Sequence, residues 1–340
     1  MPFLPLLHRL LNRESLPAAD ARAAMSAILA GEASTPQICA FLAALRVKGE
    51  TADEILGLAQ AMRDSAVRID HGITDRIVLD TCGTGGDNRG TCNVSTIVAI
   101  VVAACGVPVA KHGNRSMSSL CGSADLLEAL GVKMLTDPAA IARSIREIGF
   151  GFLFAPVLHP AMRNVMPARA ELKTKTAMNL LGPLTNPAGA TAQLAGAPSL
   201  QAAELMAVTL AALGLERGYV VHGFDGLDEV TTTAPTHMLA ITKGAIDHRE
   251  ITPEEFGVPR ATIEQLKGGD IATNRDIAVA VLSGTPGAYR DIVLVNASVA
   301  LRAAGKAQSF QEGMEIAVAA IDSGAALTKL RQVAEFSQGA

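Results

Sequence analysis

The sequence is poor in aromatic residues and in positive charge. Aromatic side chains make up 3% of the 340 residues, tryptophan is absent, and the net charge is −4 at pH 7. Proteins that bind single-stranded nucleic acid stack its bases on aromatic rings and neutralise its phosphates with lysine and arginine. We therefore expect no nucleic-acid partner. A strongly anionic ligand would need a local site or bound metal ions, because the overall charge repels it.

Paired cysteines and long apolar runs are also absent. The five cysteines, at positions 39, 82, 92, 105 and 121, form no Cys-x-x-Cys pair, so we expect reduced thiols in a cytoplasmic protein and no zinc site. The longest apolar run, Ile97 to Ala110, is shorter than the about 20 residues that cross a bilayer; it is typical of a buried helix that leads into a strand. No basic leader precedes the first apolar residues, so we expect no signal peptide and no membrane partner.

What remains predicts an α/β protein in two parts. Residues 1–70 are expected to be helical, because Thr35-Pro36 has the hydroxyl and the proline that open a helix and Thr51-Ala-Asp-Glu54 is a capping-box pattern. From residue 71 short strands alternate with helices, which predicts a mainly parallel sheet flanked by helices. The expected strands are 77–79, 107–110, 152–154, 194–196, 218–222 and 238–241, and the expected helices of this part include 124–130, 139–148, 200–213, 274–282, 291–304 and 310–323.

Two consecutive segments have the chemistry of an anion site. In the first, Asp80-Thr-Cys-Gly-Thr-Gly-Gly-Asp87, the glycines would let backbone N–H groups turn towards an oxyanion. The alternative is a plain strand-to-helix turn. Thr91-Cys-Asn-Val-Ser-Thr96 follows at the expected start of a helix, where free N–H groups and hydroxyls favour a pyrophosphate. The loop is neither a Walker A loop nor a dinucleotide GxGxxG motif.

The second segment is Lys111-His-Gly-Asn-Arg-Ser-Met-Ser-Ser119, directly after the strand expected at 107–110. In a parallel sheet it emerges at the carboxyl edge, where ligands bind in α/β folds. Lys111 and Arg115 could instead be solvated surface charges, and His112 could be a local hydrogen-bonding residue. The density of small polar residues favours a binding loop.

Two further sites stay open on the residues alone. Asp228-Glu229 lies in a glycine turn after the strand expected at 218–222. It is either exposed charge or a pair of oxygen ligands for Mg²⁺, which takes one or two carboxylates plus substrate phosphates. Arg169, close to Pro167, either pairs with a carboxylate such as Glu171 or binds a substrate carboxylate in bidentate fashion.

The segments GTGGD, NVST, KHGNR, HPAMR, NLLGPLTNP and GLDE, in this order, make the sequence resemble the anthranilate phosphoribosyltransferases, within the class II nucleoside phosphorylase superfamily. The resemblance covers almost the whole chain. It implies transfer of phosphoribosyl from phosphoribosyl pyrophosphate (PRPP) to the amine of anthranilate, with release of pyrophosphate, in tryptophan biosynthesis. It also implies a helical domain of residues 1–70, completed by about 160–190, hinged to an α/β phosphoribosyl-binding domain of residues 71–340, and a homodimer formed through the N-terminal helices.

The same resemblance implies three sets of contacts. Gly83, Asn114 and Arg169 would bind anthranilate, while Ser95, Asp228 and Glu229 would hold two Mg²⁺ ions. Lys111 and Asp87 would be catalytic, and no side chain is expected to act as an obligate nucleophile or general base. The residues implied to bind PRPP are Gly83, Gly86, Asp87, Thr91, Asn93, Val94, Ser95, Thr96, Lys111, His112, Gly113, Asn114, Arg115, Ser116, Met117, Ser118, Ser119 and Ser123.

Four positions depart from the family pattern. Cys92 stands where a larger apolar residue is common, Lys173 where glycine is usual, Lys175 where arginine is usual and Met178 where phenylalanine is usual. Lys173 and Met178 are close to Arg169, so the acceptor pocket could differ in shape. Two rival functions remain. A pyrimidine nucleoside phosphorylase would carry lysine and serine inside the glycine loop, and a nucleic-acid-binding paralogue would have a basic groove.

Overall fold

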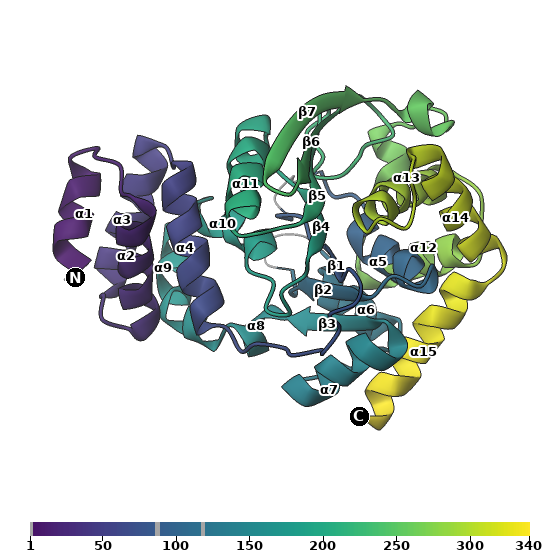
Figure 1. Ribbon diagram of the computed structural model, residues 1–340, viewed down its shortest axis with the longest axis horizontal. Helices are drawn as coiled ribbons and strands as arrows, with labels where there is room; N and C mark the ends of the chain where they lie inside the picture. Colours follow the sequence, from purple (N-terminus) through teal and green to yellow (C-terminus); the bar gives the residue numbers. More distant parts are fainter. Residues whose placement is uncertain (1–2, 86–88, 117–119) are drawn as a thin grey trace.

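The computed structural model describes residues 3–85, 89–116 and 120–340. Its first four helices pack together at one end of the molecule (Figure 1). The helix expected at Thr35 is present, but its N-cap is Ser34, whose backbone N–H donates to Gln37 Oε1 over 2.8 Å. The capping box expected at Thr51 and Glu54 is confirmed by hydrogen bonds in both directions. These helices are α1 (Phe3–Leu11), α2 (Ala18–Ala30), α3 (Thr35–Lys48) and α4 (Ala52–Ser65).

The strands of the described residues form one sheet in the order β3-β2-β1-β4-β5-β6-β7. Pairing is parallel from β3 to β5 and antiparallel from β5 to β7. The prediction of a mainly parallel sheet is therefore confirmed. The strands are β1 (Leu79–Thr81), β2 (Val109–Gly113), β3 (Phe150–Phe154), β4 (Ala192–Gly196), β5 (Arg217–Gly223), β6 (Thr236–Thr242) and β7 (Ala245–Ile251).

Two strands, β2 and β7, differ from the expected strands. Strand β2 extends to Gly113, because residues 111–113 pair with β3. Lys111 and His112 were expected in the loop after this strand. Both lie within the strand instead. Strand β7 has no counterpart among the expected strands, since it is an exposed edge strand without an apolar run. Its signal is the turn Lys243-Gly244, in which both residues have left-handed backbones (φ 48° and 86°), as tight hairpin turns require.

Helices cover both faces of the sheet (Figure 1). On one face α5 (Val94–Ala104) is almost entirely buried and packs against α13 and α15. On the other face α11 (Leu200–Ala212) lies against β5 and β6 and also contacts α4, which joins the sheet to the N-terminal helices. Each face of the sheet has its own apolar core. Val221 of β5 lies in the core that includes α5, and Val220 lies in the core that includes α11. The remaining helices here are α6 (Ser123–Ala129), α7 (Pro138–Arg143), α12 (Ile271–Leu282), α13 (Ala288–Ala303), α14 (Phe310–Asp322) and α15 (Ala325–Gly339).

The segment between β3 and β4 returns to the N-terminal helices. It contains α8 (Ala155–Leu158), α9 (Met166–Leu172) and α10 (Met178–Leu181), with a 3-10 turn at Pro160–Asn164 between α8 and α9 and another at Gly182–Leu184 after α10. Helix α9 packs against α3, and Asn164 Nδ2 donates to the carbonyl oxygen of Leu29 over 2.8 Å. Helix α9 ends at Lys173, whose backbone is left-handed (φ 45°, ψ 34°). A residue with a Cβ is disfavoured in this conformation, which accounts for glycine being the usual residue there.

We expect Lys173→Gly to raise the free energy of unfolding by about 1 kcal/mol, because the left-handed backbone is strained for lysine. Thr174→Gly is the matched control, since Thr174 is the next residue, is exposed and is not left-handed. Urea unfolding of both variants measures the effect. A Lys173→Gly protein that is less stable than the wild type would contradict the assigned strain.

Candidate functional site

A cavity of about 980 Å³ lies where the carboxyl ends of the parallel strands meet α9, α10 and their neighbouring turns. Every predicted site residue that the structure describes lines it. These residues are Gly83, Thr91, Asn93, Val94, Ser95, Thr96, Lys111, His112, Gly113, Asn114, Arg115, Ser116, Ser123, Arg169, Asp228 and Glu229. The other predicted residues, Gly86, Asp87, Met117, Ser118 and Ser119, lie outside the described residues.

The glycine segment after β1 is held against the turn that carries Asp228. The Thr84 N–H donates to the carbonyl oxygen of Gly196 over 3.0 Å, and the Gly85 N–H donates to Asp228 Oδ2 over 2.8 Å. A Cβ at Gly196 would lie 1.6 Å from the carbonyl oxygen of Asp228, so the close approach requires glycine. The glycine segment and the Asp228 turn therefore form one wall of the cavity.

Helix α5 begins at Val94, as predicted, with Asn93 as its N-cap. The Asn93 amide nitrogen donates to the carbonyl oxygen of Cys121 over 3.0 Å. In contrast, Asn93 Oδ1 and Thr96 Oγ1 are buried, and within the described part of the chain neither has a hydrogen-bond partner. Because buried polar atoms are normally paired, these two oxygens are candidates for hydrogen bonds from the hydroxyl groups of a ligand.

Lys111 carries a buried positive charge below this wall. Its side chain is 1% exposed, and the ammonium donates to the carbonyl oxygen of Thr81 and to Ser95 Oγ, the latter over 3.2 Å. Burial lowers the pKa of Lys111, whereas neighbouring groups, among them Asp80 and Glu229, raise it. The ammonium therefore links the end of β1 to the first turn of α5.

Asp80, the first residue of the glycine-rich segment, is a buried carboxylate that was not predicted as a site residue. It accepts the His112 N–H over 3.1 Å and the Asn186 side-chain amide over 2.8 Å. Burial raises the pKa of Asp80 to about 6, although Lys111 opposes this shift. The available signal was a carboxylate inside an apolar strand, because a buried charge requires a partner.

Asp228 and Glu229 both line the cavity at the carboxyl end of β5. Asn296 of α13 holds their turn from behind: its Oδ1 accepts the Val230 N–H over 2.9 Å, and its Nδ2 donates to the Val230 carbonyl oxygen over 2.8 Å. No group of three or more metal-ligating side chains occurs among the described residues. Mg²⁺ does not need such a group, since it binds one or two carboxylates plus phosphate oxygens. The two carboxylates and the Ser95 hydroxyl, which all line the cavity, are oxygen donors of the kind that Mg²⁺ takes.

Two neutral histidines line another part of the cavity. The rings of His112 and His159 are 5.1 Å apart between centroids, and burial lowers the pKa of His112 to about 3 and that of His159 to about 4. His112 Nδ1 donates to the carbonyl oxygen of Gly182 over 2.9 Å, so its Nε2 is an acceptor. That atom is buried and, among the described residues, unpartnered. The sequence reasoning omitted His159, whose only signal was its place in the HPAMR segment.

Arg169 of α9 lies in the same part of the cavity and is half-buried. Burial lowers its pKa, and no acidic side chain of the described residues pairs with it. Of the two predicted alternatives, the pairing with Glu171 is therefore not observed. Met178, one of the departures from the family pattern, also lines the cavity.

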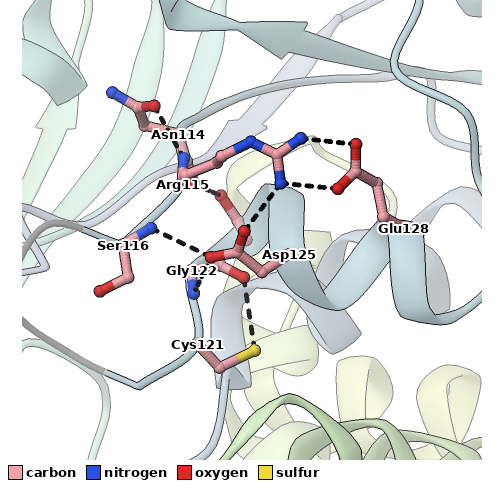
Figure 2. Close-up of polar contacts among 8 residues, drawn as sticks. Asn114, Arg115, Ser116, Cys121, Gly122, Asp125 and Glu128 are labelled. Carbon is pink, nitrogen blue, oxygen red and sulfur yellow. Dashed lines mark hydrogen bonds and ion pairs between the residues drawn. The ribbon is translucent and has the colours of Figure 1, made fainter.

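Arg115 lines the cavity but has partners of its own. Its guanidinium forms ion pairs with Asp125 and Glu128 of α6 (Figure 2).

Within the described ranges, no helix is long and apolar enough to cross a membrane.

Comparisons with known proteins give a consistent result. The family model described as "Glycosyl transferase family, helical bundle domain" matches residues 4–66, and "Glycosyl transferase family, a/b domain" matches residues 75–327. The anthranilate phosphoribosyltransferase of Solibacter usitatus is 59% identical over 337 residues and covers 99% of each chain.

Solved structures agree. The anthranilate phosphoribosyltransferase of Thermus thermophilus has a TM-score of 0.92 at 44% identity, covering 98% of this chain and 99% of that chain. The Saccharomyces cerevisiae enzyme in complex with PRPP and Mg has a TM-score of 0.91 at 28% identity, covering 99% of this chain and 98% of that chain. The yeast enzyme has also been solved with 4-fluoroanthranilate.

The two neutral histidines predict acid sensitivity. In the unfolded chain a histidine titrates near pH 6.5, about 2.5 units above the folded value of His159. The neutral rings thus stabilise the folded state above about pH 6.5, and this contribution is lost as the pH falls towards about 4. We expect His159→Gln to flatten the pH dependence of the free energy of unfolding over this range, by at most about 3 kcal/mol.

Urea unfolding at several pH values between about 7.5 and 4.5 measures this slope. His8→Gln is the control, because His8 is an exposed histidine of α1. Equal slopes for His159→Gln and the wild type would show that His159 is not held neutral by the fold.

Proposed function

Because this chain belongs to the anthranilate phosphoribosyltransferase family, we propose that it transfers the phosphoribosyl group of PRPP to the amine of anthranilate and releases pyrophosphate, a step in tryptophan biosynthesis. The observation that carries this proposal is a single cavity with two kinds of wall. One wall has the helix start and the glycine segment for an anion, and the other has neutral imidazoles and an arginine without an acidic partner among the described residues. Neither rival function has comparable support, since the chain is acidic and its relatives are transferases.

We assign the donor to the first wall. The start of α5 offers free N–H groups to a pyrophosphate, and the unpaired oxygens of Asn93 and Thr96 suit ribose hydroxyls. Lys111 supplies a fixed positive charge close to the helix start, where negative charge grows on the leaving group. Asp87 and the other predicted donor residues outside the described ranges remain predictions.

Ser95, Asp228 and Glu229 are the residues that would hold the two Mg²⁺ ions expected with PRPP. When bound, Mg²⁺ supplies positive charge that neutralises the pyrophosphate. The chain itself has a net charge of −4, so it needs this local compensation to attract the donor. Asp228 also orients the glycine segment through the Gly85 N–H.

The transfer requires no covalent enzyme intermediate. Cys82 and Cys92 line the cavity, but burial raises the pKa of both thiols, that of Cys92 to about 12. A thiol that stays protonated at neutral pH is a poor nucleophile. Catalysis then depends on holding the two substrates in contact and on the charges around the leaving group.

Anthranilate is assigned to the second wall. Arg169, which has no acidic partner among the described residues, would bind its carboxylate in the bidentate geometry that arginine favours. Gly83 and Asn114 line the same cavity and would complete the contacts. The acceptor nitrogen Nε2 of His112, which has no partner among the described residues, offers a partner for the amine.

We also propose a homodimer, a cytoplasmic location and a two-domain organisation. Leu4, Leu11 and Val47 of the N-terminal helices are 46%, 56% and 78% exposed, which supports a homodimer through these helices. None of the five cysteines forms a disulfide, which supports a reducing, cytoplasmic compartment. Because residues 160–190 pack on the N-terminal helices, we retain the division into residues 1–70 with this segment and residues 71–340, and place the hinge between them.

Loss of anthranilate fluorescence on addition of PRPP and Mg²⁺ tests the activity directly. We expect the signal to fall only when all components are present, because the amine changes its substitution in the product. A pure, folded protein that leaves the fluorescence unchanged would refute the function.

Arg169→Ala is expected to raise the KM for anthranilate by about tenfold or more and the KM for PRPP by less than about threefold, since a charge-assisted hydrogen bond to one substrate is lost. Arg22→Ala is the control, because Arg22 pairs with Asp64 on the surface of the helical part. Equal increases in the two KM values would assign Arg169 a structural role.

A further inference from the structure

Arg115 belongs to the residues expected to bind PRPP, yet the structure gives its side chain a different task. We propose that Arg115 is a positioning residue, clamped by Asp125 and Glu128, which fixes the backbone at Asn114–Ser116 and does not use its charge on the phosphates. This inference rests on the proposed function, because that backbone is part of the proposed donor site.

The guanidinium is engaged at both ends (Figure 2). Its two terminal nitrogens donate to the two carboxylate oxygens of Glu128 over 2.6 and 2.7 Å, and one of them also donates to Asp125 Oδ1 over 2.9 Å. The guanidinium carbon lies 5.7 Å from the centre of the Phe154 ring. A bidentate pair of this kind fixes both the position and the plane of the arginine.

Asp125 extends the clamp to the backbone. Its second oxygen, Oδ2, accepts the Gly122 N–H over 2.9 Å and the Ser116 N–H over 3.2 Å. A Cβ at Gly122 would lie 2.3 Å from the backbone nitrogen of Ser116, so the two segments are in direct backbone contact. One carboxylate thus ties Arg115 and Ser116 to the start of α6.

The carbonyl oxygen of Asn114 is held in the same way. It accepts the Ser123 hydroxyl over 3.1 Å and the Ala124 N–H over 3.2 Å. Asn114 and Ser116, the two neighbours of Arg115 in the chain, both line the cavity. Both are hydrogen-bonded to the first turn of α6. The place of these two residues at the site therefore depends on how firmly Arg115 is held to α6.

The charges of the clamp argue against direct phosphate binding by Arg115. One arginine faces two carboxylates, so the cluster is negative overall. A phosphate would have to displace Glu128 from a bidentate pair and approach the remaining carboxylate. Lys111 and the start of α5 offer positive charge without this cost.

Glu128→Gln separates the two roles by the sign of its effect. If Arg115 is a clamp, loosening it should weaken binding of PRPP with Mg²⁺ by about three- to tenfold, as expected for a partly exposed bidentate pair, with kcat nearly unchanged. If Arg115 binds phosphate, the same change frees its charge and PRPP binds more tightly. Titration calorimetry without anthranilate measures the affinity, and a tighter or unchanged value overturns the proposal.

Charge reversal gives a second test. Arg115→Glu should weaken PRPP binding, and the double variant Arg115→Glu with Glu128→Arg should restore most of it, because the pair re-forms with opposite polarity. A direct phosphate contact would not be restored, since position 115 remains acidic. Glu147→Gln is the matched control, as Arg146 and Glu147 form a surface pair with side chains that are 48% and 51% exposed, against 48% and 38% for Arg115 and Glu128.

Amide hydrogen exchange tests the clamp without any ligand. In Glu128→Gln the Ser116 and Gly122 amides should exchange faster than in the wild type and in Glu147→Gln, because Asp125 is less well oriented. Unchanged exchange at both amides overturns the clamp. If the wild type binds no PRPP but Glu128→Gln still exchanges these amides faster than the wild type, the proposed function is refuted and the clamp stands.

Discussion

A buried positive charge where two strands end is the interaction on which the site depends. The Lys111 ammonium lies between the end of β1 and the start of α5, above the buried carboxylate of Asp80. An ion removed from water costs several kcal/mol unless it is paired and hydrogen-bonded. The neighbouring carbonyl, hydroxyl and carboxylate groups meet that cost, and in doing so they fix β1, β2 and α5 relative to one another. The donor wall of the cavity is therefore built before a ligand arrives.

The acceptor wall depends on a different constraint, the return of the segment between β3 and β4 to the N-terminal helices. Asn164 bonds to α2 and α9 packs on α3, which brings His159 and Arg169 to the cavity that the glycine segment also lines. Because the two walls come from different parts of the fold, a small relative movement would change the distance between the substrates without disturbing either set of contacts.

Features that depend on residues close together in the sequence could be predicted. Alternating strands and helices indicated the parallel sheet, and the glycine segment with the following hydroxyls indicated an anion site at the start of α5. Features that depend on contacts between segments far apart in the sequence could not be predicted from it. The extension of β2 through His112 depends on pairing with β3, the importance of Asp80 depends on Asn186, and the placement of Asp228 depends on Asn296. Arg115 is a similar case, because a cation in a polar loop suggests a ligand until its partner on α6 is known.

We propose that one cavity joins a phosphoribosyl donor to an aromatic amine. The most direct measurement is the ratio of pyrophosphate formed, followed by phosphorus NMR, to anthranilate consumed in the same sample. We expect a ratio of one to one, with pyrophosphate formed only slowly when anthranilate is left out. Pyrophosphate release at the same rate without anthranilate, or release with no loss of anthranilate, would contradict it.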